Sequence, residues 1–335
     1  MTPYLDRQLP LPVRRRQSID WRSMNVTTLW IAAAMVIVSV TATRALIRWI
    51  DRHDDLIMNL GSGDAFRFVL VLIASYLAVI AIHELGHILG GLAAGFRFQH
   101  VRISAMLFHR TKGVSFQLGT ALLFSGEAKL IPPPGEVARS AYAVMVFAGP
   151  AANLLCAALC MFHPSGLLPF LGLSLVVGIA DLMPFEASLS ISDGERLRML
   201  FFDRPRRERW MAIVRLSAES SEGKQPEKMS PALLAKATAI RDESRDTPTA
   251  YAFAYSAAMH RREFASGGDL LEVCLQYAAH TRPNVREALI SDAAVYQAAV
   301  RHAPALASAW LADLPPTARP WLRERVETAI REATP

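Results

Sequence analysis

Four long apolar runs constrain the fold of this chain more than any other feature. They cover residues 28–48, 66–95, 141–162 and 166–185. A helix needs about 20 apolar residues to cross the hydrocarbon of a bilayer. In lipid, only helices and closed barrels satisfy their backbone polar groups. We therefore expect residues 28–200 to form a mostly α-helical, polytopic membrane bundle of about four spans.

The net charge of +6 gathers beside the apolar runs rather than forming one basic face. Basic residues next to hydrophobic segments mark the cytoplasmic side of a membrane. The pattern predicts a multi-pass protein of the cell membrane, such as a bacterial inner membrane, with both termini cytoplasmic and residues 1–27 as a basic tail. It gives no indication of a nucleic-acid partner. The flanking arginines are Arg7, Arg14, Arg15, Arg16 and Arg22 before the first run, and Arg196, Arg198, Arg204, Arg206, Arg207 and Arg209 after the last.

The segment between the second and third runs has a different pattern. Polar and apolar residues alternate over residues 96–103 and 114–119, which is typical of short strands. Residues 130–135, with three consecutive prolines, interrupt any regular structure. We expect a small β element here, beside the membrane.

Residues 201–335 have an ordinary charge content and helical spacing of alanine and leucine. They predict a soluble, cytoplasmic helical domain that binds a protein partner. Breaks are expected near Pro248 and Pro283. Residues 251–259 and 292–302 resemble each other weakly, so tetratricopeptide-like repeats and an unrelated helical bundle both remain open.

The second apolar run contains the sequence His83-Glu84-Leu85-Gly86-His87. On a helix, positions i and i+4 share one face, so both imidazoles can reach a single zinc ion. Glu84 can then act as general base toward a metal-bound water. Ionisable residues inside an apolar run are costly unless they are functional or satisfied. The pattern therefore predicts a zinc site in this helix.

A catalytic zinc usually takes three protein ligands, so a third must come from elsewhere. Asp193 is favoured, because Gly194 beside it allows close approach to another element. Ser192 and Glu195 also fit a capping box, which would place Asp193 in a first helical turn without any metal. The candidates in or near the membrane half are Asp181, Glu186, Asp193, Glu195, His100 and His109.

Three motifs in order resemble the site-2 protease family of intramembrane zinc metalloproteases. They are the His83 to His87 motif, residues 147–153 with Gly149, Pro150 and Asn153, and residues 181–184 followed by Asp193 and Gly194. The likeness covers about residues 66–200. It implies a core of three spanning helices with zinc held by His83, His87 and Asp193, and Glu84 as the catalytic base.

The resemblance further implies that Asn153 and Asp181 contact the substrate. That substrate would be a transmembrane protein segment, unwound in the lipid bilayer and paired like a strand with residues 96–119. The family commonly has Asn where this chain has Asp181, and its spacer before the third ligand is often shorter.

Two other functions stay open from the sequence. One is a catalytically inactive membrane scaffold that binds a partner through its carboxy-terminal helical domain, which would be consistent with Asp181 and the long spacer. The other is a zinc protease of another class, whose third ligand is a glutamate. The glutamates in range are Glu127, Glu136, Glu186 and Glu195.

Overall fold

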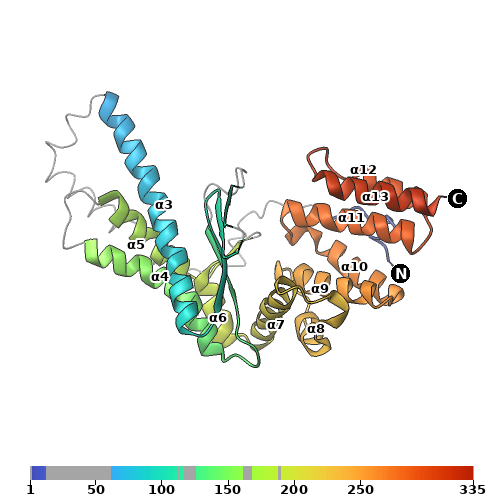
Figure 1. Ribbon diagram of the computed structural model, residues 1–335, viewed down its shortest axis with the longest axis horizontal. Helices are drawn as coiled ribbons and strands as arrows, with labels where there is room; N and C mark the ends of the chain where they lie inside the picture. The colour runs from blue at the N-terminus through green and yellow to red at the C-terminus, as the bar shows by residue number, and fades with distance from the viewer. Residues whose placement is uncertain are drawn as a thin grey trace, which may run out of the picture. The chain divides into compact units, whose positions relative to one another are not determined.

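The computed structural model describes residues 2–12, 62–111, 113–116, 126–160, 168–187 and 190–334. The predicted first span, residues 28–48, lies outside the described residues. The chain is mostly helical with small antiparallel sheets, as the sequence predicts (Figure 1). It divides into two compact units. One contains the apolar helices and the larger sheet, with Ile191–Leu200. The other contains Phe201–Pro335 together with Glu186–Ser190 and residues 2–12.

Two helices of the first unit are long and apolar enough to cross a membrane. These are α3 (Ser62–Ala93), within which Val69–Ala93 qualifies, and α4 (Arg139–Cys160), within which Arg139–Leu159 qualifies. Only 33% and 39% of the two apolar windows are buried, whereas the core helix of a soluble protein is mostly buried. The side chains of Leu89 and Leu155 are about 60% exposed, as lipid-facing residues would be.

The predicted fourth span is shorter than expected. Helix α5 (Leu168–Leu182) has 15 residues, about 22 Å at 1.5 Å per residue, and hydrocarbon is about 30 Å thick. The helix ends just before Pro184, because a proline disfavours helical backbone in the residue preceding it. Two helices of spanning length, rather than four, are therefore present in the described ranges.

Small residues set the spacing of α3 and α4, which lie side by side (Figure 1). A Cβ atom added at Gly86 would overlap Ala148 and Ala152, and one at Gly90 would overlap Ala148. Close helix contact through small residues is typical of membrane bundles. It brings the histidine face of α3 against α4.

The sheet of the first unit has four antiparallel strands in the order β3-β2-β1-β4. β1 is central and β4 is an edge strand, with Val101 opposite Phe108 on one side and Ala128 on the other. Alternation predicted β1 and β3 but not β2 or β4. The strands are β1 (Arg97–Ile103), β2 (Met106–His109), β3 (Gly113–Phe116) and β4 (Gly126–Ile131), and β5 (Glu186–Ala187) with β6 (Ser190–Ile191) forms a separate ladder.

Helices make up the second unit. Its core includes Tyr251, Leu271 and Trp310, each less than 5% exposed. Two of its helices begin at the predicted breaks, Asp246 and Pro283. The helices are α7 (Arg204–Ser221), α8 (Pro231–Thr238), α9 (Asp246–His260), α10 (Phe264–Gln276), α11 (Pro283–Ala299), α12 (Pro304–Ala312) and α13 (Pro320–Ala333), with single turns at Pro226–Lys228 and Ala278–His280.

The amino-terminal segment differs from the separate tail expected over residues 1–27. Residues 2–12 belong to the helical unit, and Leu5 is fully buried in its core. The leucine was hidden from sequence reasoning because the basic composition of the tail suggested a solvated segment.

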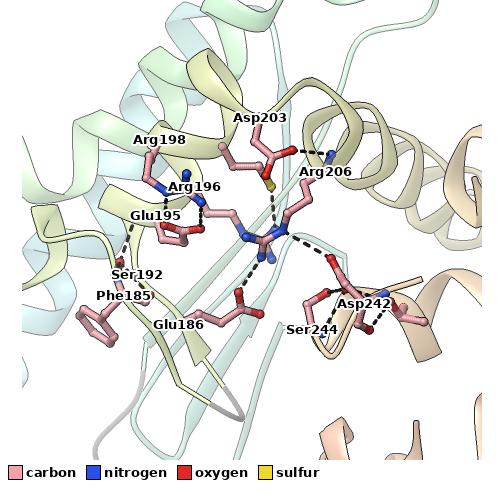
Figure 2. Close-up of polar contacts among 12 residues, drawn as sticks. Phe185, Glu186, Ser192, Glu195, Arg196, Arg198, Asp203, Arg206, Asp242 and Ser244 are labelled. Carbon is pink, nitrogen blue, oxygen red and sulfur yellow. Dashed lines mark hydrogen bonds and ion pairs between the residues drawn. The ribbon is translucent and has the colours of Figure 1, made fainter. Parts of the chain in front are cut away.

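A fully buried arginine ties α7 to the loop before α9. Arg209 forms two hydrogen bonds with the Asp242 carboxylate, of 2.8 and 2.9 Å, and one with Ser244. Arg206 adds contacts to Asp242 and Glu186 (Figure 2). Burial raises the pKa of Asp242, but the hydrogen bonds from Arg209 and Ser244 outweigh it and hold this pKa well below its usual range.

Candidate metal centre

Helix α3 brings two imidazoles to one point. His83 and His87 are one turn apart, and their Nε2 atoms are separated by 3.1 Å. The rings lie edge to face, with centroids 4.7 Å apart, so that both nitrogens point toward the same space. Both side chains are at most 14% exposed.

Asp193 reaches the same point from the start of α6 (Asp193–Phe202). Its Oδ2 atom lies 3.2 Å from Nε2 of His83 and 3.2 Å from Nε2 of His87. Burial raises the pKa of Asp193, but interaction with the two histidines outweighs it and holds this pKa at about 2. The carboxylate is therefore ionised at neutral pH.

Local structure at the start of α6 fixes the direction of Asp193. The Ser192 Oγ accepts a hydrogen bond of 3.1 Å from the Glu195 N–H, as predicted for a helix cap (Figure 2). The Ser192 N–H donates to the Phe185 carbonyl. A Cβ atom at Gly194 would overlap the Leu182 carbonyl, so the predicted close approach is present. Helix capping thus coexists here with a candidate metal ligand.

The three ligand atoms suit a tetrahedral cation. Their mutual distances are 3.1, 3.2 and 3.2 Å, which form one nearly equilateral face. Ligands about 2.1 Å from a tetrahedral zinc are separated by about 3.4 Å. Asp193 Oδ2 is buried without hydrogen-bond geometry to any described partner, which leaves a lone pair directed at this space. Two imidazoles with one carboxylate are also a donor set that zinc favours.

Contacts of the other ring nitrogen, Nδ1, orient both imidazoles. His87 Nδ1 lies 2.8 Å from the Met145 carbonyl oxygen, so Nδ1 carries the proton and donates, and Nε2 keeps its lone pair for a metal. His83 Nδ1 lies 3.2 Å from the Asn153 Nδ2 atom. Asn153 is fully buried in α4. Both contacts come from the helix whose small residues let it approach α3.

The Asn153 amide has two useful orientations. With Nδ2 toward His83, the amide donates to Nδ1, which leaves the imidazole proton on Nε2. A half-turn of the amide would present Oδ1, which has no hydrogen-bond partner in the described part of the chain. Nδ1 would then donate, and Nε2 would be free to bind a metal. The amide matches the tautomer that a metal requires only in this second orientation.

Glu84 is buried beside the edge strand β4. Its side chain accepts a hydrogen bond from the Ala128 backbone N–H and lies close enough to His83, His87 and Asp193 to interact electrostatically. A Cβ atom at Gly126 would overlap the Glu84 carboxylate, so a larger residue there would displace this side chain. The predicted base is thus adjacent to the three ligands and to a strand edge.

Asp181 lies at the end of α5, with Oδ2 3.7 Å from His83 Nε2. Its side chain is 35% exposed, so it borders the site and remains accessible to a ligand. Asn153, by contrast, is enclosed and contacts His83. Substrate contact by these two residues stays a prediction.

The other candidate ligands lie elsewhere. His100 and His109 face each other across β1 and β2, with ring centroids 5.1 Å apart. Glu127, Glu186 and Glu195 form ion pairs with Arg102, Arg206 and Arg198 respectively, and Glu136 is exposed. In the described ranges, the group able to hold a metal is His83, His87 and Asp193, so a glutamate ligand is not supported.

Sequence reasoning missed three contributors. The Met145 carbonyl and the Ala128 N–H are backbone groups, which no residue type reveals. Gly149 was noted only within a motif, but a Cβ atom there would overlap the His87 imidazole. For this position, the one signal in the sequence was a glycine in the middle of an apolar helix.

Comparison with known proteins adds no relative: no protein-family model, no curated protein and no solved structure matches this chain.

Proposed function

We propose that this protein is an intramembrane zinc metalloprotease of the site-2 type. The observation that carries the proposal is the convergence of His83, His87 and Asp193 within 3.1–3.2 Å beside buried Glu84. His83 lies ten residues before the end of α3, about 15 Å along the axis, in a helix long and apolar enough to span. The site would then lie near the middle of the bilayer.

Zinc held by these three residues would polarise a peptide carbonyl and lower the pKa of a bound water to about 7. Glu84 would take the proton of the attacking water and pass it to the leaving amine. The Ala128 N–H holds the Glu84 carboxylate in place for both transfers. Met145 keeps the His87 imidazole in the tautomer that exposes Nε2, and Asn153 would do the same for His83 with its Oδ1 turned toward Nδ1.

The substrate proposal needs one change from the sequence expectation. Strand pairing was expected with residues 96–119, where β1 and β2 are paired on both sides and β3 is an edge strand. The open edge beside Glu84 is β4, Gly126–Ile131. We infer that an unwound transmembrane segment adds to β4, which would place an exposed peptide bond next to the base.

A topology of four crossings, with both termini cytoplasmic, accompanies this function. Residues 2–12 dock on the unit that contains Phe201–Pro335, so both lie on one side of any membrane. The number of crossings between them is then even. Two crossings by α3 and α4 would satisfy this alone. The apolar run 28–48 and α5 must therefore both cross or both not cross. Crossing by both would require α5, about 22 Å long, to span a locally thinned bilayer.

The test replaces the base and leaves the metal ligands. We expect Glu84→Gln to retain one zinc per chain and to lower cleavage at least a hundredfold, because proton transfer contributes that much. The readout is quantitative proteomics of membranes from cells expressing either form, scored for accumulated membrane proteins. Glu327→Gln, exposed on α13 and far from the site in the chain, is the matched control and should cleave normally. Undiminished cleavage by Glu84→Gln would refute the role.

A catalytically inactive scaffold is the second candidate. Asp181 favours it, because a carboxylate 3.7 Å from His83 would repel an incoming carbonyl oxygen. Zinc analysis of the purified chain separates the two functions. Loss of zinc in Asp193→Ala but not in Glu186→Ala supports the enzyme. No zinc in the wild type, together with unchanged membrane proteomes, supports the scaffold.

A further inference from the structure

The amino-terminal segment is held in the helical unit as a bound peptide would be. Leu5 is fully buried and shares a cluster with Trp310 and Leu314, while Gln8 and Leu9 are exposed. Figure 1 shows the segment beside α11. Among the described residues, all backbone-to-backbone hydrogen bonds of the segment run within the segment itself. Side chains of the helices therefore supply its polar anchoring.

Three of these side chains bind the backbone around Leu5. The Glu272 carboxylate of α10 accepts from the N–H groups of Tyr4 and Leu5, at 2.9 and 2.8 Å. Gln297 of α11 and Trp310 of α12 donate to the Leu5 carbonyl, at 2.8 and 3.1 Å. Both donors are at most 1% exposed. Without an occupant, the two buried donors and the Glu272 carboxylate would lose these partners, which is unfavourable.

Charges on either side of the helices fix the direction of the segment. Asp6 pairs with Arg301, and Arg7 pairs with Asp313 at 2.6 Å. The Arg7 guanidinium also lies 5.0 Å from the centre of the Trp310 ring. These contacts specify a leucine followed by an acidic and then a basic residue.

We propose that α10, α11 and α12 form a peptide-binding groove, occupied at rest by residues 2–12 of the same chain. The groove recognises a short segment that buries a leucine. The backbone N–H groups of this leucine and of the residue before it donate to the groove, and an acidic and then a basic residue follow the leucine. A partner protein that carries this pattern displaces the resident segment. This inference is independent of the protease proposal, because no metal ligand lies in the groove.

The test makes the resident segment exchangeable without deleting it. A specific protease site is inserted after Arg16 in the full chain, which is purified in detergent and cut. A fluorescent peptide of residues 1–12 is then added, and its anisotropy is followed. We expect saturable binding, competed by unlabelled peptide and weakened at least tenfold by Leu5→Asp in the peptide.

Matched variants of the groove complete the experiment. Glu272→Gln should weaken binding at least tenfold, because it loses two charge-assisted hydrogen bonds. Glu243→Gln, exposed in the same unit, should bind as the wild type does. Failure of the peptide to enter a folded, cut chain would overturn the proposal, as would equal binding of the Leu5→Asp peptide. The uncut chain should be monomeric, and a dimer that the peptide dissociates would overturn occupancy by the same chain.

Discussion

Single residues shape the candidate metal centre as much by their small size as by their functional groups. Gly149 gives the His87 imidazole room beside α4, and Gly126 gives the Glu84 carboxylate room beside β4. Met145 and Asn153 then hold the rings by hydrogen bonds. Since ligand geometry tolerates only small displacements, positions without any functional group can control metal affinity.

Gly149→Ala tests this directly. The added methyl group would overlap the His87 ring and push Nε2 away from the other two ligand atoms. We expect zinc affinity to fall at least tenfold, measured by competition with a chelator. Gly172→Ala, in α5 with nothing within 4 Å of the added carbon, is the control and should bind zinc normally. Equal affinities of the two variants would mean that α4 moves aside.

At the scale of elements, each unit is joined by contacts that its helices could not make alone. Small residues bring α3 against α4. Gly194 at the start of α6 lets the chain approach the Leu182 carbonyl at the end of α5, where Asp181 also lies. In the helical unit, Arg209 of α7 depends on Asp242 in the loop before α9. A buried arginine that loses its carboxylate is strongly destabilising.

The Asp242 pair predicts a pH dependence of the helical unit. The folded pKa of Asp242 lies below its ordinary value of about 3.9, so its stabilisation is complete above that pH. It is lost as the pH falls further toward the folded pKa. Asp242→Asn should destabilise α7 by about 2 kcal/mol at pH 7. The difference from wild type should shrink below about pH 4.

Hydrogen exchange of peptides from α7, corrected for the intrinsic rate at each pH, measures this difference. Asp269→Asn, exposed on α10, is the control and should leave α7 unchanged. A gap between wild type and Asp242→Asn that stays constant between pH 7 and pH 3 would contradict the assignment to this carboxylate.

For the whole molecule, docking of residues 2–12 on the helical unit constrains how the chain meets a membrane. Leu5 and the unit that encloses it must lie on one side. Under the proposed membrane topology, α3 and α4 together with the run 28–48 and α5 would return the chain to the side from which it began.

Labelling from each side of the membrane checks this topology. Gln8→Cys and Glu332→Cys are both exposed positions, one in the segment and one in α13. We expect both to react with a membrane-impermeant maleimide in inverted vesicles and neither in intact cells. The chain without an added cysteine supplies the background. Reaction of the two positions from opposite sides would contradict the docking.

The sequence by itself determined the features that depend on local geometry. The spacing of His83 and His87 places them on one helix face in any helix, and apolar length alone marks α3 and α4 as potential spans. The cap at Ser192 and the strand β1 follow from short patterns. Asp193 was predicted from its glycine neighbour and a family resemblance rather than from spacing.

Only the tertiary structure decided which distant groups meet. Three contacts join segments that lie far apart in the chain. They are the hydrogen bond from the Ala128 N–H to Glu84, the contact of the Asn153 amide with His83, and the enclosure of Leu5 in the helical unit. Such contacts depend on how closely helices and strands pack, and packing is a property of the complete set of side chains. The short α5 also reflects this limit, because an apolar run does not reveal where its helix ends.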